Sequence, residues 1–267
     1  MLPDIEHASD MLQLTKRGYR GAGPRAPMRS IMFSIVFAAI VAAPAHAQVP
    51  FTLRDCLADR DEDARLHICS IMSGTEEEKA LGAVEASRIL RARGEYDAAL
   101  ALLTGLWPGV SRDAELGHIW FEQGDHRMAD FHFEMALEYG LDPDRQTRER
   151  MVIAAHMHGE ELQYSSENFP GAISAYSRAL ALNPDHAPAL LGLAEALQRL
   201  DRHEEALADL DRAIALGADW TGYLLRARTR QELGDAAGAI ADFRRVLEEN
   251  PEHIGARQAL AEMTARP

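Results

Sequence analysis

Histidines gather in the middle of the chain, where their types and spacing could do metal chemistry. The stretch HMHGEE places His156, His158 and Glu161 close together, and three more histidines precede it: His118, His126 and His132. Imidazole and carboxylate groups are zinc ligands, so a metal-dependent accessory enzyme is one hypothesis. On a helix, however, side chains at positions i and i+2 point about 200° apart, so His156 and His158 cannot coordinate the same ion. That hypothesis therefore rests on clustering alone.

Other catalytic patterns are missing from the sequence. It contains no glycine-rich phosphate loop, no G-x-S-x-G elbow and no cysteine placed as a nucleophile. We therefore expect no enzyme activity, no cofactor and no metal site.

The first 47 residues are typical of a signal peptide. Met28-Arg29 precedes the apolar run IMFSIVFAAIVAA, and Ala45-His46-Ala47 follows as a small-x-small cleavage site. A membrane-spanning helix needs about 20 apolar residues, and this run is shorter and is broken at Pro44. We expect a periplasmic or secreted protein that is soluble after cleavage near Ala47. Residues 1–27 show no periodicity, so translation starting at Met28 is an alternative to Met1.

Export gives the two cysteines a structural interpretation. Cys56 and Cys69 lie in DCLADRDEDARLHICSIMSG, and an isolated pair in an oxidising compartment most simply forms one disulfide. A redox or zinc role would need Cys-x-x-Cys spacing or clustered histidine ligands, and neither is present. The disulfide would join a short helix near 52–59 to a second near 61–72.

The charge balance disfavours nucleic acid as a partner. The chain has a net charge of −14, and the leader carries three acidic and five basic residues, so its removal makes the protein more acidic. Nucleic-acid binding rests on lysines and arginines that neutralise phosphates. A protein or peptide partner fits this composition better.

A repeated pattern that would position these groups begins after the cysteines. A small residue is followed by a large apolar one four positions later, and the leading alanines are spaced by 30, 43, 34 and 33 residues: Ala99, Ala129, Ala172, Ala206 and Ala239. A turn precedes each alanine, and several of these turns contain a glycine that allows a helix to end in the left-handed conformation. The pattern predicts two helices in each unit.

These motifs resemble the tetratricopeptide repeat family, whose pattern is W-x2-L-G-x2-Y, then A-x3-F, then P, at a period of 34. The resemblance covers about residues 80–253. In the second unit it is carried by Leu116-Gly117-x2-Trp120, Ala129-x3-Phe133 and Pro143. In the fourth and last units it is carried by Leu190-x2-Leu193-Ala194-x2-Leu197, Tyr223, Ala227, Ala239-x3-Phe243 and Pro251.

The third unit departs from the family pattern. An in-register alignment puts Glu160 where the family has Gly or Ala, and the 43-residue spacing implies a longer first helix or a longer preceding loop. The repeat register between about 140 and 168 is therefore open. The cysteine pair ahead of the repeats resembles exported repeat proteins of alphaproteobacteria, which supports a periplasmic setting.

The resemblance implies an all-α fold, a right-handed superhelical α-solenoid of about five stacked helical hairpins. The expected domains are the leader at 1–47, a disulfide-bonded helical cap at 48–79, the repeats at 80–253 and a capping helix at 254–267. A hairpin of 34 residues cannot bury its apolar face alone, so neighbouring units must stack.

Family geometry also predicts a partner-binding groove along the first helix of each unit. Its expected lining residues are Arg88, Arg91, His118, Phe121, Glu122, Met157, Glu161, Tyr164, Leu191, Glu195, Gln198, Leu224, Arg228 and Gln231. Apolar groups interleaved with arginines suit an extended peptide or a partner helix. A solvated face with scattered charges is the alternative.

The expected function is that of a periplasmic scaffold in envelope assembly, and a secretion-machinery or outer-membrane subunit is an alternative with a different partner. Repeat domains of this family that clamp a C-terminal carboxylate use lysines and asparagines at fixed points. Lys79 is the one lysine after the leader, so we expect no such clamp.

Overall fold

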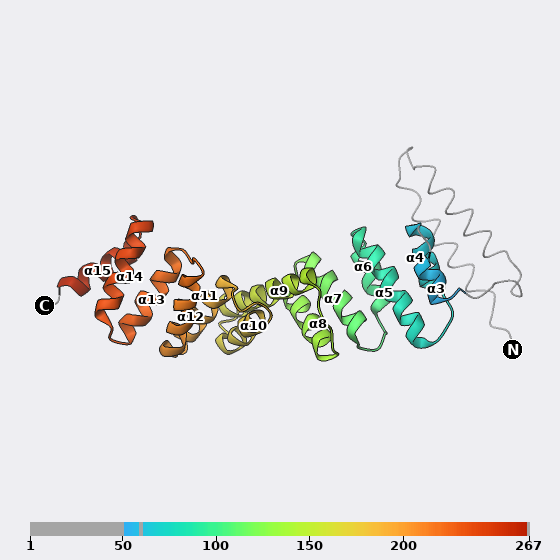
Figure 1. The fold of residues 1–267 in the computed structure, drawn as a ribbon, viewed down its shortest axis with the longest axis horizontal. Helices are drawn as coiled ribbons and strands as arrows, with labels where there is room; N and C mark the ends of the chain where they lie inside the picture. The colour runs from blue at the N-terminus through green and yellow to red at the C-terminus, as the bar shows by residue number, and fades with distance from the viewer. Residues whose placement is uncertain (1–50, 59–60, 266–267) are drawn as a thin grey trace, which may run out of the picture. The chain divides into compact units, whose positions relative to one another are not determined.

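The computed structural model describes residues 51–58 and 61–265, and all regular secondary structure within these ranges is helical (Figure 1). Residues 51–267 form one unit and residues 1–50 another. The expected leader and its cleavage site lie outside the described residues. Among the residues described, no helix is both long enough and apolar enough to cross a bilayer.

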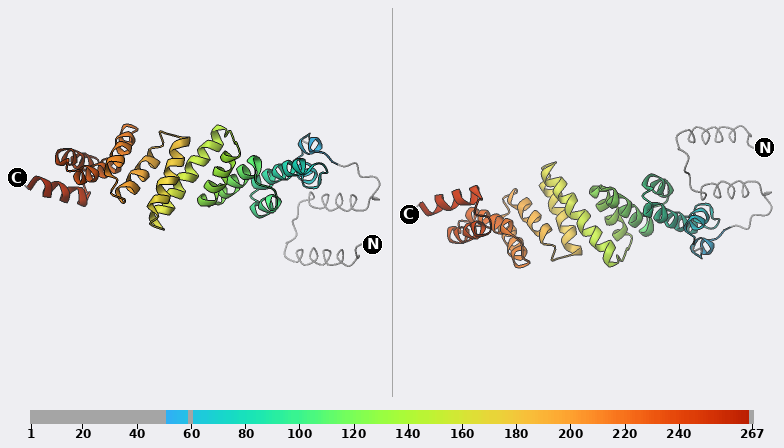
Figure 2. Two further views of the ribbon diagram at one scale, coloured as in Figure 1. Left: turned by 90° about the horizontal axis from the view of Figure 1, so that it is seen from below. Right: turned by 90° about the horizontal axis from the view of Figure 1, so that it is seen from above.

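The helices follow one another as antiparallel neighbours. Their bounds are α3 Leu53–Ala58, α4 Glu62–Ile71, α5 Glu76–Ala92, α6 Tyr96–Leu103, α7 Val110–Gln123, α8 His126–Glu138, α9 Arg145–Tyr164, α10 Phe169–Leu182, α11 Ala187–Gln198, α12 His203–Ala215, α13 Trp220–Glu232, α14 Ala236–Glu249 and α15 Ile254–Ala265. Each helix packs on the next one in the chain, and the first helices of neighbouring units also touch, as α11 and α13 do (Figures 1 and 2). The five hairpins from α5 to α14 confirm the predicted solenoid of helical units.

Helix ends are defined by short polar side chains. Thr75 and Glu78 form a capping box at the start of α5, in which each side chain accepts a hydrogen bond from the other's backbone N–H. Asp125, Asp144 and Asn168 cap α8, α9 and α10 in the same local manner. The hairpin turns are therefore encoded within a few residues of sequence.

The repeated alanines lie at the centre of each hairpin. Ala129, Ala172, Ala206 and Ala239 are completely buried. The large residue four positions later is also buried in each of these hairpins, as Phe133, Tyr176, Leu210 and Phe243. Small residues let the helix axes approach, and the large side chains fill the groove of the neighbouring helix. The small and large residues that alternate in the sequence pattern thus form the core of the solenoid.

In the third unit, the repeat register differs by one residue from the alignment that places Glu160 at the Gly/Ala position. A Cβ on Gly159 would lie 2.6 Å from Cε1 of Tyr176, and a Cβ on Gly117 would lie 2.4 Å from Cδ1 of Phe133. Gly159, and not Glu160, therefore lies at the position where the family pattern has Gly or Ala. The extra residue is accommodated in the α9–α10 turn, where Glu167 adopts φ 49°. The long spacing arises from α9 itself, a helix of 20 residues against 14 for α7.

The N-terminal helices α3 and α4 are joined by the cysteine pair. The Sγ atoms of Cys56 and Cys69 form a disulfide, and both residues are buried. They pack against Met72 and against Ala86 of α5. This pair of helices therefore covers the exposed side of the first repeat hairpin.

The last helix, α15, packs on α14 through one face. Ala256 is buried, and Ala259, Leu260 and Met263 pack partly buried against the last hairpin. Ile254 is 68% exposed because it begins the helix, where the chain leaves the turn. The face of α15 away from α14 is exposed to solvent, as suits a terminal helix.

Candidate functional site

The predicted groove residues all lie on the first helices of the hairpins, α5, α7, α9, α11 and α13. Three hollows line these helices. The N-terminal hollow includes Arg88, Arg91 and His118, the middle hollow includes Met157, Glu161 and Tyr164, and the C-terminal hollow includes Gln198, Leu224, Arg228 and Gln231. The predicted residues thus divide into three groups with different surroundings.

The N-terminal hollow is bridged by ion pairs within the protein. Arg91 donates to Glu115 at 2.7 Å and to Glu122 at 2.5 Å, and Arg150 donates to the same Glu122 oxygen at 2.8 Å. The Arg150 guanidinium also lies 5.5 Å from the ring centroid of Phe121. Arg91, Phe121 and Glu122 therefore already have partners inside the protein, and little of their binding capacity is free for a ligand.

Arg150 is a residue that sequence reasoning missed. It lies near the start of α9, in the part of that helix that exceeds the usual repeat length. The one available signal was the 43-residue spacing between Ala129 and Ala172, which indicates added structure but not which side chain crosses to α7.

His118 is held in its neutral form by the same network. Arg150 donates to Nδ1 at 3.2 Å, and Nε2 lies 3.3 Å from Oγ1 of Thr147. Burial, followed by the charges of Arg91 and Arg150, lowers the pKa of His118 to about 4. At neutral pH this side chain therefore adds no positive charge to the face.

Glu115 is the most deeply buried acid of the network. Its side chain is 1% exposed, and Arg88 lies 3.6 Å from it in addition to Arg91. Burial raises the pKa of Glu115 even though the hydrogen bond from Arg91 opposes that shift. The carboxylate therefore depends on its arginine partners for stability in this position.

The middle hollow lies between the α7–α8 turn and the second half of α9. Tyr164 is 62% exposed there, and its hydroxyl donates to Glu195 of α11 at 2.7 Å. Burial of the hydroxyl and the hydrogen bond to Glu195 raise the pKa of Tyr164, so the phenol stays protonated. Met157 is 37% exposed beside it. This hollow therefore presents an aromatic and an apolar side chain to solvent.

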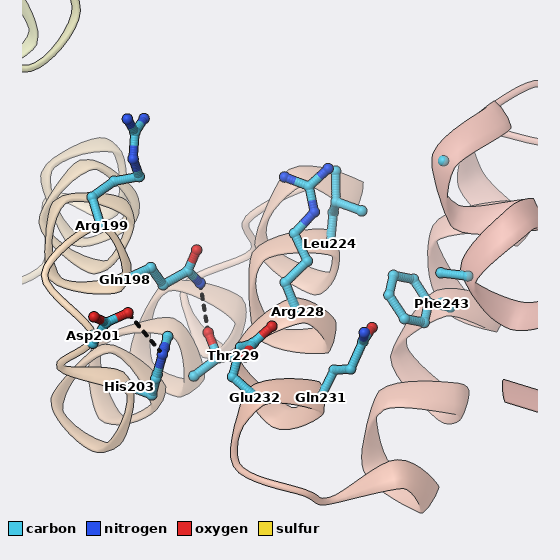
Figure 3. Close-up of a pocket in the computed structure, with 12 residues that line it drawn as sticks. Gln198, Arg199, Asp201, His203, Leu224, Arg228, Thr229, Gln231, Glu232 and Phe243 are labelled. Carbon is cyan, nitrogen blue, oxygen red and sulfur yellow. Dashed lines mark hydrogen bonds and ion pairs between the residues drawn. The ribbon is translucent and has the colours of Figure 1, made fainter. Parts of the chain in front are cut away.

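The C-terminal hollow encloses about 520 Å³ between α11, α13, α14 and α15 (Figure 3). The Gln198 amide donates to the carbonyl of Leu225 at 2.9 Å and to Oγ1 of Thr229 at 2.5 Å, which ties α11 to α13. Leu224 is only 8% exposed and packs in the last core cluster, so it forms part of the wall rather than a free contact. Leu191 likewise packs against the core.

Arginines with no ion pair line the C-terminal hollow. Arg228 of α13 is exposed and makes no ion pair or hydrogen bond among the described residues. Arg199, which sequence reasoning missed, caps the end of α11 and lies 4.6 Å from the ring centroid of Phe169. This hollow therefore contrasts with the N-terminal one, where the arginines are engaged.

The histidines of the third unit lie in separate contacts. His156 packs against Tyr176 and His186, with ring centroids 5.8 and 5.3 Å away, whereas Nδ1 of His158 lies 2.7 Å from Asp130. Arg178 also pairs with Asp130. Within the described residues, no group of three or more histidine, cysteine or acidic side chains is arranged to hold a metal ion. His156 therefore takes part in ring packing, and His158 in a polar contact with Asp130.

The comparisons with known proteins agree with this fold. Two tetratricopeptide repeat models match residues 163–229 and 222–253. The chain is 30% identical over 155 residues to a DnaJ homolog subfamily C member 7 homolog of Schizosaccharomyces pombe, which covers 54% of this chain and 32% of that protein. It is 32% identical over 100 residues to an Hsp70-Hsp90 organizing protein of Triticum aestivum, which covers 37% of this chain and 17% of that protein. The chain thus spans a third or less of the length of these two relatives.

A solved structure shares the stacked helical hairpins. YrrB, described as a TPR protein with an unusual peptide-binding site, is similar with a TM-score of 0.50 and 18% identity, over 68% of this chain and 92% of that chain. At this level of identity the similarity concerns the fold alone. The family models and this fold together support the tetratricopeptide repeat family for this chain.

Proposed function

We propose that this protein is an exported scaffold that binds an extended peptide or a partner helix along the first helices of its repeats. The observation that carries the proposal is the series of hollows on α5, α7, α9, α11 and α13, two of which leave side chains free. Tyr164 and Arg228 are exposed there, while the alanines and large apolar residues of the hairpins are buried. Exposed aromatic and arginine side chains beside concave surfaces are typical of interface hot spots.

The free contacts lie toward the C-terminal half of the predicted groove. Arg91, Phe121 and Glu122 are tied to one another through Arg150. Binding a partner there would require breaking ion pairs, which costs more than contacting exposed side chains that take part in no ion pair. We therefore place the partner over α9, α11 and α13.

The similar proteins support a role in protein binding. One relative is named an Hsp70-Hsp90 organizing protein, and another is a DnaJ homolog. The hollows present exposed side chains such as Tyr164, Arg228 and Gln231, which suit contacts with another protein. A partner that is a protein segment is therefore the simplest occupant.

Export and a role in envelope assembly complete the proposal. They rest on the signal-peptide pattern of residues 1–47 and on the Cys56–Cys69 disulfide, which persists in oxidising compartments. Fractionation of cells producing the full chain tests export. Recovery of the shortened protein in the periplasm or medium agrees with it, whereas unprocessed protein in the cytoplasm contradicts it.

Crosslinking in cells followed by affinity capture tests partner binding. The tagged full chain is compared with Tyr164→Ala/Gln231→Ala, which removes two exposed side chains from different units. We expect the wild-type chain to capture a discrete partner that the variant loses, with equal helicity by circular dichroism.

The control variant is Glu204→Ala/Arg244→Ala, which changes exposed residues of the second helices α12 and α14. It should retain the partner. Capture that survives the Tyr164 and Gln231 changes but is lost in the control would move binding to the second-helix side, against the proposal.

A further inference from the structure

The ring of Tyr176 is the packing centre between the third and fourth hairpins. Helices α9, α10 and α11 lie side by side in the middle of the described chain, and each contacts the other two (Figure 1). A Cβ on Gly159 of α9 would lie 2.6 Å from Cε1 of the ring, and a Cβ on Gly192 of α11 would lie 2.5 Å from Cζ. Both helices therefore rest against this one fully buried side chain.

Two partly buried imidazoles border the same ring. The ring centroid of His156, on α9, lies 5.8 Å from that of Tyr176 and 5.3 Å from that of His186. His186 directly precedes α11, and its Nε2 is buried without a hydrogen bond to any described residue. We call this set of residues the Tyr176 joint: His156, Gly159, Tyr176, His186 and Gly192.

No acidic side chain is placed to stabilise a protonated imidazole in the Tyr176 joint. Nε2 of His156 lies 3.9 Å from Oε1 of Glu160, which is beyond hydrogen-bonding distance. The Glu160 carboxylate is also 41% exposed, so water screens its charge. His158 differs, since its Nδ1 lies 2.7 Å from Asp130. The paired imidazoles of the joint thus lack the counterion that this neighbour has.

The other charged groups near the Tyr176 joint are engaged elsewhere or exposed. The ionisable groups around it are Glu160 and Tyr164 from α9, Tyr176 from α10, Asp185 from the α10–α11 connection, Glu195 from α11 and Arg212 from α12. Glu195 accepts the hydrogen bond of the Tyr164 hydroxyl, and Arg212 donates to the carbonyl of Pro184 at 2.8 Å. Asp185 is exposed to solvent.

These surroundings keep both imidazoles neutral while the joint is packed. Burial lowers the pKa of His156, and burial followed by the neighbouring His156 lowers the pKa of His186. A charge on His186 would also lie at the N-terminus of α11, where the helix dipole disfavours a cation. Two imidazolium rings 5.3 Å apart would repel each other most strongly where water is excluded. Acid therefore favours a conformation in which the rings separate and become hydrated.

We propose that the Tyr176 joint is an acid-sensitive hinge between the third and fourth hairpins. When His156 and His186 take up protons, their rings separate, and the start of α11 loses its fixed position against α9 and α10. The closed joint binds fewer protons than the open one, so opening begins as the pH falls below the ordinary histidine pKa of about 6.5. Protonation of clustered histidines is a known way to bias a packed contact that has two arrangements. This inference goes beyond the proposed function and concerns the chain without a partner.

Opening the joint would change the alignment of the hollows. The middle hollow lies on the second half of α9, whereas the C-terminal hollow begins at Gln198, the last residue of α11. The hydrogen bond from Tyr164 to Glu195 also crosses from α9 to α11, at 2.7 Å. Acid should therefore shift the two hollows relative to each other.

Hydrogen exchange of the full chain, followed by mass spectrometry at pH 7.0 and 5.0, tests the hinge. The rates are converted to protection factors, which removes the pH dependence of the chemical exchange step. We expect the protection of residues 183–190 to fall by about tenfold or more at pH 5.0, because the His186 carbonyl accepts hydrogen bonds from Ala189 and Leu190. Residues 220–249 contain no histidine, and their protection should change by less than about threefold.

Two variants make the test specific. His156→Phe/His186→Asn removes both titrating groups, while phenylalanine keeps a ring beside Tyr176 and asparagine suits the position before a helix. Its protection in residues 183–190 should be nearly the same at both pH values. His118→Gln is the matched control, because it removes another neutral histidine, on α7 and outside the joint. It should retain the full loss of protection in residues 183–190.

An equal loss of protection in residues 220–249 would overturn the hinge in favour of general acid unfolding. A loss that persists in His156→Phe/His186→Asn would overturn the role of the two histidines. NMR titration of their ring protons in the wild type is an independent check, since both midpoints must lie below about 6.5. A midpoint at or above this value would overturn the inference even if the double variant does not fold.

The outcome for the hinge is separate from that for the proposed function. Exchange and titration are measured on the chain without a partner. Retention of the crosslinked partner by Tyr164→Ala/Gln231→Ala would therefore contradict the scaffold function and leave the hinge standing.

Discussion

The ring of Tyr176 lies against Gly159, where a Cβ would come within 2.6 Å of Cε1. This approach brings α9 and α10 together in the same way that Gly117 brings α7 to Phe133 of α8. Tyr176 is fully buried, so the ring has no room to move aside.

Gly159→Ala should therefore destabilise the protein although alanine favours helices. The helix propensity gains about 1 kcal/mol, but overpacking a rigid core costs about 1–3 kcal/mol. We expect the free energy of unfolding in urea to fall by up to about 2 kcal/mol. In Gly255→Ala the nearest atom is 3.4 Å away, an ordinary contact, so that control should unfold no earlier than the wild type. Equal effects of the two substitutions would show that the Tyr176 contact is not tight.

Arg91→Met should destabilise the N-terminal repeats by leaving Glu115 without its main partner. A buried charge that loses its partner typically costs about 3–5 kcal/mol, and the remaining Arg88 should reduce this to about 2–4 kcal/mol. Arg91→Met/Glu115→Gln removes the uncompensated charge and should recover most of the loss. Urea unfolding of the four proteins of this double-mutant cycle measures the coupling, and additive effects would contradict the ion pair.

Stability should decline as the pH falls below about 6.5. Burial lowers the pKa of His118 to about 4, and burial also lowers the pKa values of His132, His156 and His186. Between these values and the ordinary histidine pKa, the folded chain binds fewer protons than the unfolded chain, so acid favours unfolding. His118 alone should account for about 2 kcal/mol between pH 6.5 and 4, allowing for its partial exposure to solvent.

His118→Gln tests this contribution, since glutamine keeps a polar group beside Arg150 and Thr147 but does not titrate in this range. The slope of unfolding free energy against pH should be shallower in the variant. The His118 ring signals in NMR should titrate near pH 4 in the wild type, and a midpoint near 6.5 would contradict the burial argument.

Removing the disulfide should affect α3 and α4 first. Closing a loop of about 15 residues contributes about 3 kcal/mol in the chain-entropy model. In Cys56→Ala/Cys69→Ala we expect faster hydrogen exchange in α3 and α4 and little change in α11 to α14, since each hairpin contacts mainly its neighbours. Uniformly faster exchange along the chain would show instead that the repeats unfold as one cooperative unit.

The hairpins could be predicted because their signals are local. The spacing from Ala129 to Phe133 and from Ala239 to Phe243 places a small and a large residue one helical turn apart, so each pair faces the neighbouring helix. Caps such as Asp125 lie within three residues of the amides they bind. These features depend on short stretches of chain, and the structure reproduces them.

The details of the candidate site depended on distant contacts. A single added residue in the α9–α10 turn places Gly159, and not Glu160, where the family pattern has Gly or Ala. Only the contact between Gly159 and Tyr176 reveals this register. Arg150 crosses from α9 to Glu122 and Phe121, and so changes predicted groove residues into parts of an internal network. Arg199 faces the C-terminal hollow from the end of α11, a place that the repeat pattern does not mark.

The amino-acid sequence by itself determined the helical hairpins, their number and the helices that line the three hollows, because the period of apolar residues dictates which helix faces must be buried. The tertiary structure decided which charged side chains on those helices are already paired and which are free. Ion pairing depends on atoms within about 4 Å that come from different helices, and sequence spacing does not specify such distances. Arg91 and Arg228 occupy similar helices, and only packing separates the engaged arginine from the free one.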